Sequence, residues 1–427
     1  MSNATRILIA LIAGLVLGIG GSSFAPSLAT SAAEVADPIG NLWLNGLRMT
    51  IVPLVVALLV TGIAATAEAA RAGRVAGRAL AWILAIMATS AVVGAVLTPL
   101  LLHLFPLPVA SAAALRSALS TASPIGSAPP FADFLRAIVP TNPIAAAAND
   151  AILPLMIFTG VFAFALTRLP DEPRERLTGF FSALSDAMLV VIDWVLKLAP
   201  IGVFALAFVV GARSGAAAFG ALLHYVIVVA TVGLAIGLSA YPLARFGAKI
   251  SFGKFAREIA PVQAVAVSTQ SSLACLPLML EKSEDLGVSE ATAGVSLPMA
   301  VALMRATGPA MNLAVALYVA NWFGVHLGPA QYAVAILAAM LTSMGAVSLP
   351  GQVSFVTSIA PICLALGIPV EPLALLIAVE TMPDIFRTLG NAMMDVAMTA
   401  TVARQTGTMA GEAGAEAGNS LPSSPSP

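Results

Sequence analysis

"VSTQSSLACLPLML" (residues 267–280) is an apolar segment that is interrupted by small polar residues and a proline. "TSMGAVSLPGQVSFV" (residues 342–356) is a second segment of the same kind, and a long apolar stretch follows each, at 289–321 and 368–403. Non-helical backbone at membrane depth is tolerated only where it is buried in protein or lines a cavity. Two interrupted segments in corresponding positions of two halves are typical of a transporter's binding site. We therefore predict two re-entrant helical hairpins, with kinked ordinary spans as the alternative.

The whole chain has the composition of a membrane protein. Of its 427 residues, 59% are hydrophobic and 10% are charged, whereas soluble proteins average about 25% charged residues. The net charge of -1 and the lack of a dense Lys/Arg cluster indicate no nucleic-acid partner. Two cysteines and three scattered histidines form neither a disulfide framework nor a metal-ligand pattern. Membrane lipid is therefore the expected surrounding, and no cofactor is expected.

Six apolar stretches of spanning length precede the first hairpin, and a span needs about 20 residues. They lie near residues 5–22, 42–68, 79–104, 136–169, 180–211 and 217–245. Basic residues follow the second, fourth and sixth stretches, whereas the loops at 23–40 and 105–130 hold only Arg116. Because positive residues stay in the cytoplasm, we predict a cytoplasmic N-terminus. This topology favours a first span over a cleaved signal peptide, which residues 5–22 also resemble.

The last apolar stretch contains "ETMPDIFRTLGNAMMD" (residues 380–395), which is unusually polar for its surroundings. On a helix, five of its side chains fall within about 80° of one another. They are Glu380, Asp384, Arg387, Asn391 and Asp395. A charge at the bilayer centre costs at least about 3 kcal/mol, so this polar stripe must face protein or a water-filled cavity. A self-neutralising network around Arg387 explains two or three of these residues, whereas a binding site explains all five.

An intramembrane protease would need a Ser–His pair or two catalytic aspartates in facing helices. No histidine falls in the hairpins or in the last stretch, and an arginine between the acids does not suit proteolysis. We therefore predict that the protein is not an enzyme.

Seven motifs, in order, resemble the dicarboxylate/amino acid:cation symporter family, the glutamate transporter family, over nearly the whole chain. They are "NGLRMTIVPLVV", "MATSAVV", "IVPTNPIAAAANDAILP", "WVLKLAPIGVFAL", "STQSSLACLP", "SMGAVSLPG" and "DIFRTLGN" with the later Asp395. The resemblance implies an all-α polytopic membrane protein with eight transmembrane helices plus two re-entrant helical hairpins, the glutamate-transporter-like elevator fold. It also implies a homotrimer in the cell inner membrane, with both termini cytoplasmic.

The resemblance further implies a division into a fixed scaffold and a mobile transport domain. The scaffold would comprise spans 1–2 (residues 1–78) and spans 4–5 (residues 129–213). The transport domain would comprise span 3 with its extracellular loop (79–128) and residues 214–404, which hold span 6, both hairpins, span 7 and span 8. Residues 405–427 are low in complexity and are predicted to be a disordered cytoplasmic tail. The second hairpin would be the extracellular gate, with Gly345, Pro350 and Gly351 at its tip.

The same resemblance implies roles for the polar stripe in binding a small anionic substrate. Arg387 would hold the substrate's side-chain carboxylate, and Asp384 would hold its α-ammonium. The other implied contacts are Asn391 at the α-carboxylate, Thr388, and backbone N–H groups around Ser271, Ser272 and Ser348 at the hairpin tips. Family members for plain C4-dicarboxylates lack an acid at the Asp384 position. An acidic amino acid is therefore favoured, with a C4-dicarboxylate as the alternative.

The seventh span departs from the family. Where the family carries an Asn-Met-Asp-Gly-Thr signature, this chain reads Met304-Arg305-Ala306-Thr307-Gly308. Two of the family's sodium ligands are therefore missing, although Asp395, Asn391, Thr89 and Ser90 remain. Arg305 could stand in as a built-in cation, and Glu380 could carry a proton, so sodium or proton coupling stays open. In the second alternative, Arg305 pairs with Asp395 or Glu380 in a non-transporting sensor or structural homologue.

Overall fold

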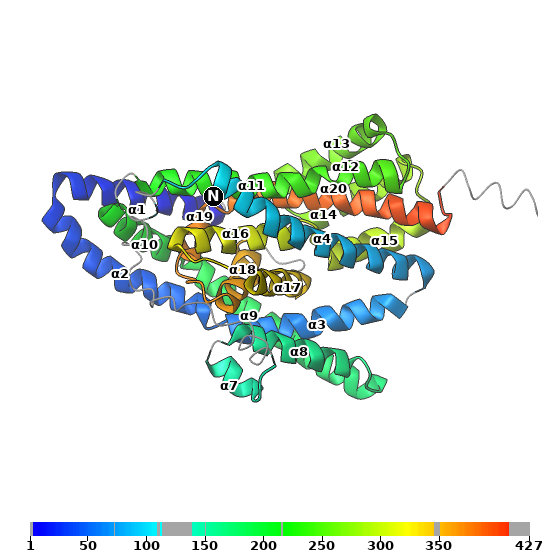
Figure 1. Cartoon of the computed structure of the whole chain (residues 1–427), viewed down its shortest axis with the longest axis horizontal. Coiled ribbons are helices and arrows are strands. Elements are labelled where there is room, and N and C mark those ends of the chain that lie inside the picture. Colours follow the sequence, from blue (N-terminus) through cyan, green and yellow to red (C-terminus); the bar gives the residue numbers. More distant parts are fainter. Residues whose placement is uncertain are drawn as a thin grey trace, which may run out of the picture. The chain divides into compact units, whose positions relative to one another are not determined.

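The computed structural model describes residues 3–71, 73–108, 112, 139–149, 151–214, 217–345 and 351–409. Within these ranges the chain is helical almost throughout (Figure 1), and its only extended pairing is one isolated bridge between Val288 and Met409. Ser348 and Pro350 lie outside the described residues, as does most of the predicted tail, 410–427. The prediction of an all-helical membrane protein is confirmed.

Two compact units make up the chain. The first consists of Met1–Ala65, Ala88–Gly233 and Gly308–Asp384, and the second of Thr66–Met87, Leu234–Thr307 and Ile385–Pro427. The earlier helices are α1 (Asn3–Phe24), α2 (Pro26–Arg48), α3 (Ile51–Arg71), α4 (Arg74–Leu104), α7 (Pro143–Ala148), α8 (Ile152–Leu166), α9 (Asp171–Lys197), α10 (Ala199–Ser214) and α11 (Ala217–Leu238). The later ones are α12 (Ala240–Pro242), the π-helix η1 (Leu243–Gly247), α13 (Phe252–Thr269), α14 (Ser272–Asp285), α15 (Glu290–Leu303), α16 (Gly308–Phe323), α17 (Pro329–Gly345), α18 (Gly351–Ala365), α19 (Leu373–Val379) and α20 (Thr381–Thr406).

Six helical segments in the described part of the chain are long and apolar enough to cross a membrane. They are Thr5–Phe24, Pro26–Ala69, Arg74–Leu104, Asp171–Lys197, Gly220–Gly247 and Glu290–Phe323. Four shorter apolar helices accompany them: Ile152–Leu166, Ala199–Arg213, Pro329–Met344 and Ser354–Ala365. The last two belong to the second interrupted segment, where crossing in one pass is not expected.

Two predicted boundaries are wrong, and proline explains both. The expected loop at 23–40 is mostly helical because α2 begins at Pro26, and the fixed φ of proline suits the first helical position. The expected single span at 180–211 is divided at Leu198, between α9 and α10. Pro200 lies in the first turn of α10, and its missing N–H and its ring prevent α9 from continuing through it.

Both interrupted segments form helical hairpins, as predicted. In the first, α13 packs against α14, and in the second, α17 packs against α18. Gln270 ends α13 in the left-handed region, at φ 51°. Ser271 then begins α14, because its side-chain oxygen accepts a hydrogen bond from the backbone N–H of Ala274 at 3.3 Å. A polar N-cap of this kind satisfies one of the free N–H groups of a helix start.

Helices α1 and α10 approach each other closely at glycines. A Cβ atom at Gly18 would lie 2.4 Å from the carbonyl oxygen of Phe208 and 2.7 Å from the amide nitrogen of Ala212. Gly14, one turn earlier, would place a Cβ 2.6 Å from the carbonyl oxygen of Phe204. Small residues four apart allow such backbone contact between membrane helices, where lipid gives no hydrophobic drive to associate.

Replacing Gly18 with valine should therefore force α1 and α10 apart. We expect a loss of about 1–3 kcal/mol in the free energy of unfolding, the range seen for overpacking, and a lower melting temperature in detergent. Gly20→Val is the matched control on the same helix, because nothing lies within 4 Å of a Cβ at that position. Equal losses for both variants would show that the close approach at Gly18 does not matter.

Candidate functional site

The predicted polar stripe is present, and all five of its residues are buried. Exposed fractions are 1% for Glu380, 7% for Asp384, 4% for Arg387, 5% for Asn391 and 0% for Asp395. Glu380 lies between α19 and α20, and its carbonyl accepts a hydrogen bond from the amide of Asp384 at 2.9 Å. The helical pattern therefore continues through the junction, which keeps the stripe on one face. Thr388, also predicted as a contact, is 5% exposed on the same helix.

The predicted stretch 289–321 is not continuous, which corrects the sequence expectation. It is divided into α15 and α16, and Met304, which follows α15, has extended backbone at φ -103° and ψ 128°. Pro309 lies in the first turn of α16 and prevents the preceding residues from continuing α15. The break therefore covers residues 304–307, where the sequence departs from the family signature.

Thr307 closes this break against the last helix. Its backbone N–H and its hydroxyl both contact Oδ1 of Asn391 at 2.9 Å, and the hydroxyl also lies 3.1 Å from the carbonyl oxygen of Arg387. Thr307 is fully buried. Two donors on Oδ1 fix the orientation of the Asn391 amide, so its NH₂ group remains to donate. The role at an α-carboxylate stays a prediction for Asn391.

Asp395 is buried without a partner. Within the described ranges, neither of its carboxylate oxygens has a hydrogen-bond partner, so the Arg305–Asp395 pair considered above does not form. Arg305 itself is partly exposed. An isolated ionised carboxylate in an apolar interior is strongly unfavourable, so this group is either neutral or compensated by a cation. No three His, Cys, Asp or Glu side chains of the described chain gather as a metal site.

Two further cation candidates lie in the first unit. Ser90 is 1% exposed, and its hydroxyl accepts a hydrogen bond from the amide of Ala310 at 3.3 Å, which caps the start of α16. Thr89, its neighbour, is exposed. Ser90 therefore has a hydrogen-bond partner, Ala310, that the residues around Ser90 in the sequence do not predict.

Glu380 has a partner that sequence reasoning missed. The hydroxyl of Tyr225, on α11, donates to Oε2 of Glu380 at 3.1 Å, and Tyr225 is fully buried. The ring of Tyr225 packs edge-on against Tyr318 of α16, with centroids 5.4 Å apart. A single tyrosine in an apolar span carries no sequence signal for a contact so far along the chain.

The hairpin tips are described in part. The side-chain oxygen of Ser271 caps α14, and Ser272 is the first residue of that helix, so free backbone N–H groups gather there. Such a helix start favours an anion. Gly345 ends α17 and Gly351 begins α18. Pro350, predicted to belong to the gate, and Ser348, predicted as a contact, lie outside the described residues.

The chain matches a known family and curated relatives over nearly its whole length. Residues 4–405 match the model of the sodium:dicarboxylate symporter family. A proton/glutamate-aspartate symporter of Escherichia coli is 27% identical, over 92% of this chain and 91% of its own length. C4-dicarboxylate transport proteins of Azorhizobium caulinodans and Rhizobium leguminosarum are 29% and 28% identical, over 94% and 93% of this chain and 88% of each relative. The chain is thus a member of the sodium:dicarboxylate symporter family, a family of transporters and not of enzymes.

Proposed function

We propose that this protein is a secondary active transporter that carries an acidic amino acid, aspartate or glutamate, across the inner membrane. The buried stripe on α20 is the observation that carries the proposal. Arg387 offers a guanidinium fork for a carboxylate, and Asp384, one turn earlier, offers an acid for an ammonium. The name of the Escherichia coli relative supports the same substrate class. Transport would proceed by an elevator movement within a homotrimer.

A C4-dicarboxylate is the second candidate substrate. The names of the Azorhizobium and Rhizobium relatives favour it. Asp384 argues against it, because family members for plain C4-dicarboxylates lack an acid at this position, and this chain carries one that is 7% exposed. The two candidate substrates therefore differ in whether Asp384 would bind an ammonium group of the substrate.

Uptake into proteoliposomes tests the proposal directly. Labelled aspartate, glutamate and succinate would be offered to the purified, reconstituted protein under imposed sodium or proton gradients. Saturable uptake of aspartate or glutamate above succinate supports the proposal. Preference for succinate would select the dicarboxylate candidate, and no uptake of any of the three would favour a non-transporting sensor.

The coupling proposed here does not need sodium at the altered seventh span. Met304 and Ala306 offer no side-chain oxygen where the family has sodium ligands, and Arg305 brings a positive charge to the same place. The break is closed by hydrogen bonds from Thr307 to Asn391, so no ion is required to hold it. Glu380, whose carboxylate accepts a hydrogen bond from Tyr225, is the proposed proton carrier. An ionised carboxylate at membrane depth is costly, and binding a proton removes that cost.

We therefore expect uptake that an inward proton gradient drives and that sodium changes little. Glu380→Gln should lose the proton-driven component while substrate exchange between loaded vesicles continues, because glutamine keeps the hydrogen bond to Tyr225 but cannot titrate. Glu172→Gln is the control, because Glu172 is exposed and pairs only at the surface with Arg176. Steep sodium dependence would exclude the role of Arg305, and proton-driven uptake that persists in Glu380→Gln would remove Glu380 from the mechanism.

A further inference from the structure

The segment that joins α11 to the first hairpin is strongly basic. Four cations lie within it or just after it: Arg245, Lys249, Lys254 and Arg257. Glu258, directly after Arg257, is the only acidic residue between positions 239 and 258. The candidate span Gly220–Gly247 ends inside this segment, so these cations lie at its end or shortly after it.

The fold turns the apolar side of this segment inward and the basic side outward. Ala244, Ala248, Ile250 and Phe255 are buried, whereas Arg245 and Lys249 between them are exposed. Phe246 is 76% exposed and Phe252 is 50% exposed. Two phenylalanine rings of this segment are therefore exposed together with the cations, whereas other apolar side chains of the same segment are buried.

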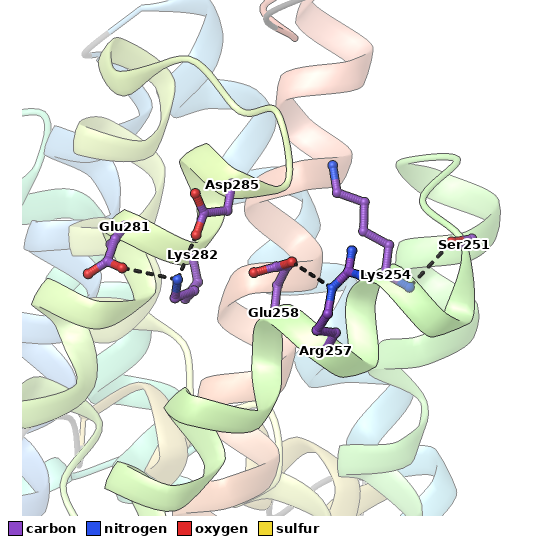
Figure 2. Close-up of polar contacts among 7 residues, drawn as sticks. All are labelled: Ser251, Lys254, Arg257, Glu258, Glu281, Lys282 and Asp285. Carbon is purple, nitrogen blue, oxygen red and sulfur yellow. Dashed lines mark hydrogen bonds and ion pairs between the residues drawn. The ribbon is translucent and has the colours of Figure 1, made fainter.

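Nearby acids pair with Arg257 but with none of the other three cations. Figure 2 shows that Glu281 and Asp285, on α14, both bind Lys282, at 3.0 and 2.6 Å. The hydrogen bond to Asp285, followed by that to Glu281, raises the pKa of Lys282. Glu258 binds its neighbour Arg257 at 3.1 Å, and the Arg257 side chain is still 74% exposed. Across the described chain, no ion pair forms at Arg245, Lys249 or Lys254.

The basic residues in the first turns of α9 are paired with acids, whereas Arg74 and Arg78, which are exposed, form no ion pair in the described chain. After α8, Arg174 pairs with Asp171 at 2.6 Å and Arg176 pairs with Glu172 at 2.5 Å. The general preference for positive charge on one side of a membrane requires only that such residues be present. It does not explain why one basic segment is paired with acids and another is left open and flanked by aromatic rings.

Lys249 closes the end of η1. Its backbone lies in the left-handed region at φ 59°, where glycine is the usual residue. The amide of the next residue, Ile250, donates to the carbonyl oxygen of Ala244 at 3.0 Å, as is common at the end of a helix. This turn leaves the side chain of Lys249 exposed.

We propose that Arg245, Phe246, Lys249 and Phe252 form a binding surface for the phosphate headgroups of anionic phospholipids. Cations next to a membrane surface attract anionic lipid, and each contributes to the attraction. Phenylalanine side chains next to Lys and Arg are buried at the boundary between headgroups and hydrocarbon in segments that bind a membrane surface. The rings and the end of the spanning helix favour a lipid headgroup over free phosphate, which needs no apolar neighbours. We call this surface the lipid-binding patch.

Thermal unfolding in detergent micelles tests the patch. Added phosphatidylglycerol should raise the melting temperature of the wild-type protein, because a ligand that binds only the folded state stabilises it by mass action. Phosphatidylcholine at the same concentration should raise it much less. The double variant Arg245→Gln/Lys249→Gln should lose most of the difference between the two lipids. The matched control Arg174→Gln/Arg176→Gln should keep that difference, because its arginines pair with acids.

Two further arms decide between the remaining explanations. Inorganic phosphate at the same concentration should not raise the melting temperature, and an equal rise would overturn the lipid as occupant. Lys249→Gly removes the charge and places glycine, the usual residue, in the left-handed conformation. It should unfold at or above the wild-type temperature in phosphatidylcholine and show a smaller rise with phosphatidylglycerol. A full rise in Lys249→Gly and in the double variant would overturn the patch.

Discussion

Replacing Arg387 with alanine should abolish useful binding of any substrate that carries a side-chain carboxylate. Arg387 is 4% exposed on the buried stripe of α20, so a bound carboxylate would lose its partner where water cannot replace it. Loss of one partner of a buried pair costs roughly 3–5 kcal/mol, or more than about a hundredfold in affinity. Titration calorimetry or competition of labelled uptake with aspartate and glutamate measures the loss.

Arg387→Lys separates the charge from the shape of the guanidinium. Lysine keeps the charge but cannot form two parallel hydrogen bonds to a carboxylate, so we expect an affinity between those of the wild type and the alanine variant. Size-exclusion chromatography should show an unchanged assembly for both variants. Near wild-type affinity for aspartate in Arg387→Ala would refute the assigned role.

The second large effect is expected at Asp384. Asp384→Asn should weaken binding of aspartate and glutamate far more than binding of succinate or malate, which have no ammonium to lose. A hydrogen bond to a charged group contributes about 1.5–3 kcal/mol, so a tenfold to hundredfold loss for the amino acids is expected. Competition of the four compounds against one labelled substrate gives the ratio of affinities in a single series.

The dicarboxylates are the internal control for this prediction. If the affinity for succinate falls as much as that for aspartate, Asp384 has a structural role, for example as a partner of Arg387. That outcome would also weaken the preference for an acidic amino acid, because this preference depends on the acid at position 384.

The hairpins and the polar stripe could be predicted because both are local in sequence. Small polar residues and proline interrupt the two hairpin segments within a few residues, and the stripe follows the period of a single helix. The burial of Glu380 and Asp395, at 1% and 0% exposure, agrees with this expectation. Where the chain's own periodicity carries the information, the sequence is sufficient.

The partners of those side chains could not be predicted, because they come from distant segments. Thr307 and Asn391 are 84 residues apart, and Tyr225 and Glu380 are 155 apart. Ser90 caps the start of α16 through Ala310, which lies 220 residues later in the sequence. Neither composition nor periodicity relates such positions. The break at 304–307 was missed for a different reason, since Pro309 was read as part of a continuous apolar stretch.

The break between α15 and α16 also has a consequence for synthesis of the chain. The residue that satisfies it, Asn391, leaves the ribosome 84 residues after Thr307. Until α20 is inserted, the amide of Thr307 would be an unpaired donor in hydrocarbon, which is strongly unfavourable. The two hydrogen bonds that Thr307 makes to Asn391 can therefore form only after the last helix has been synthesised, so a chain that stops before Asn391 would lack both of them.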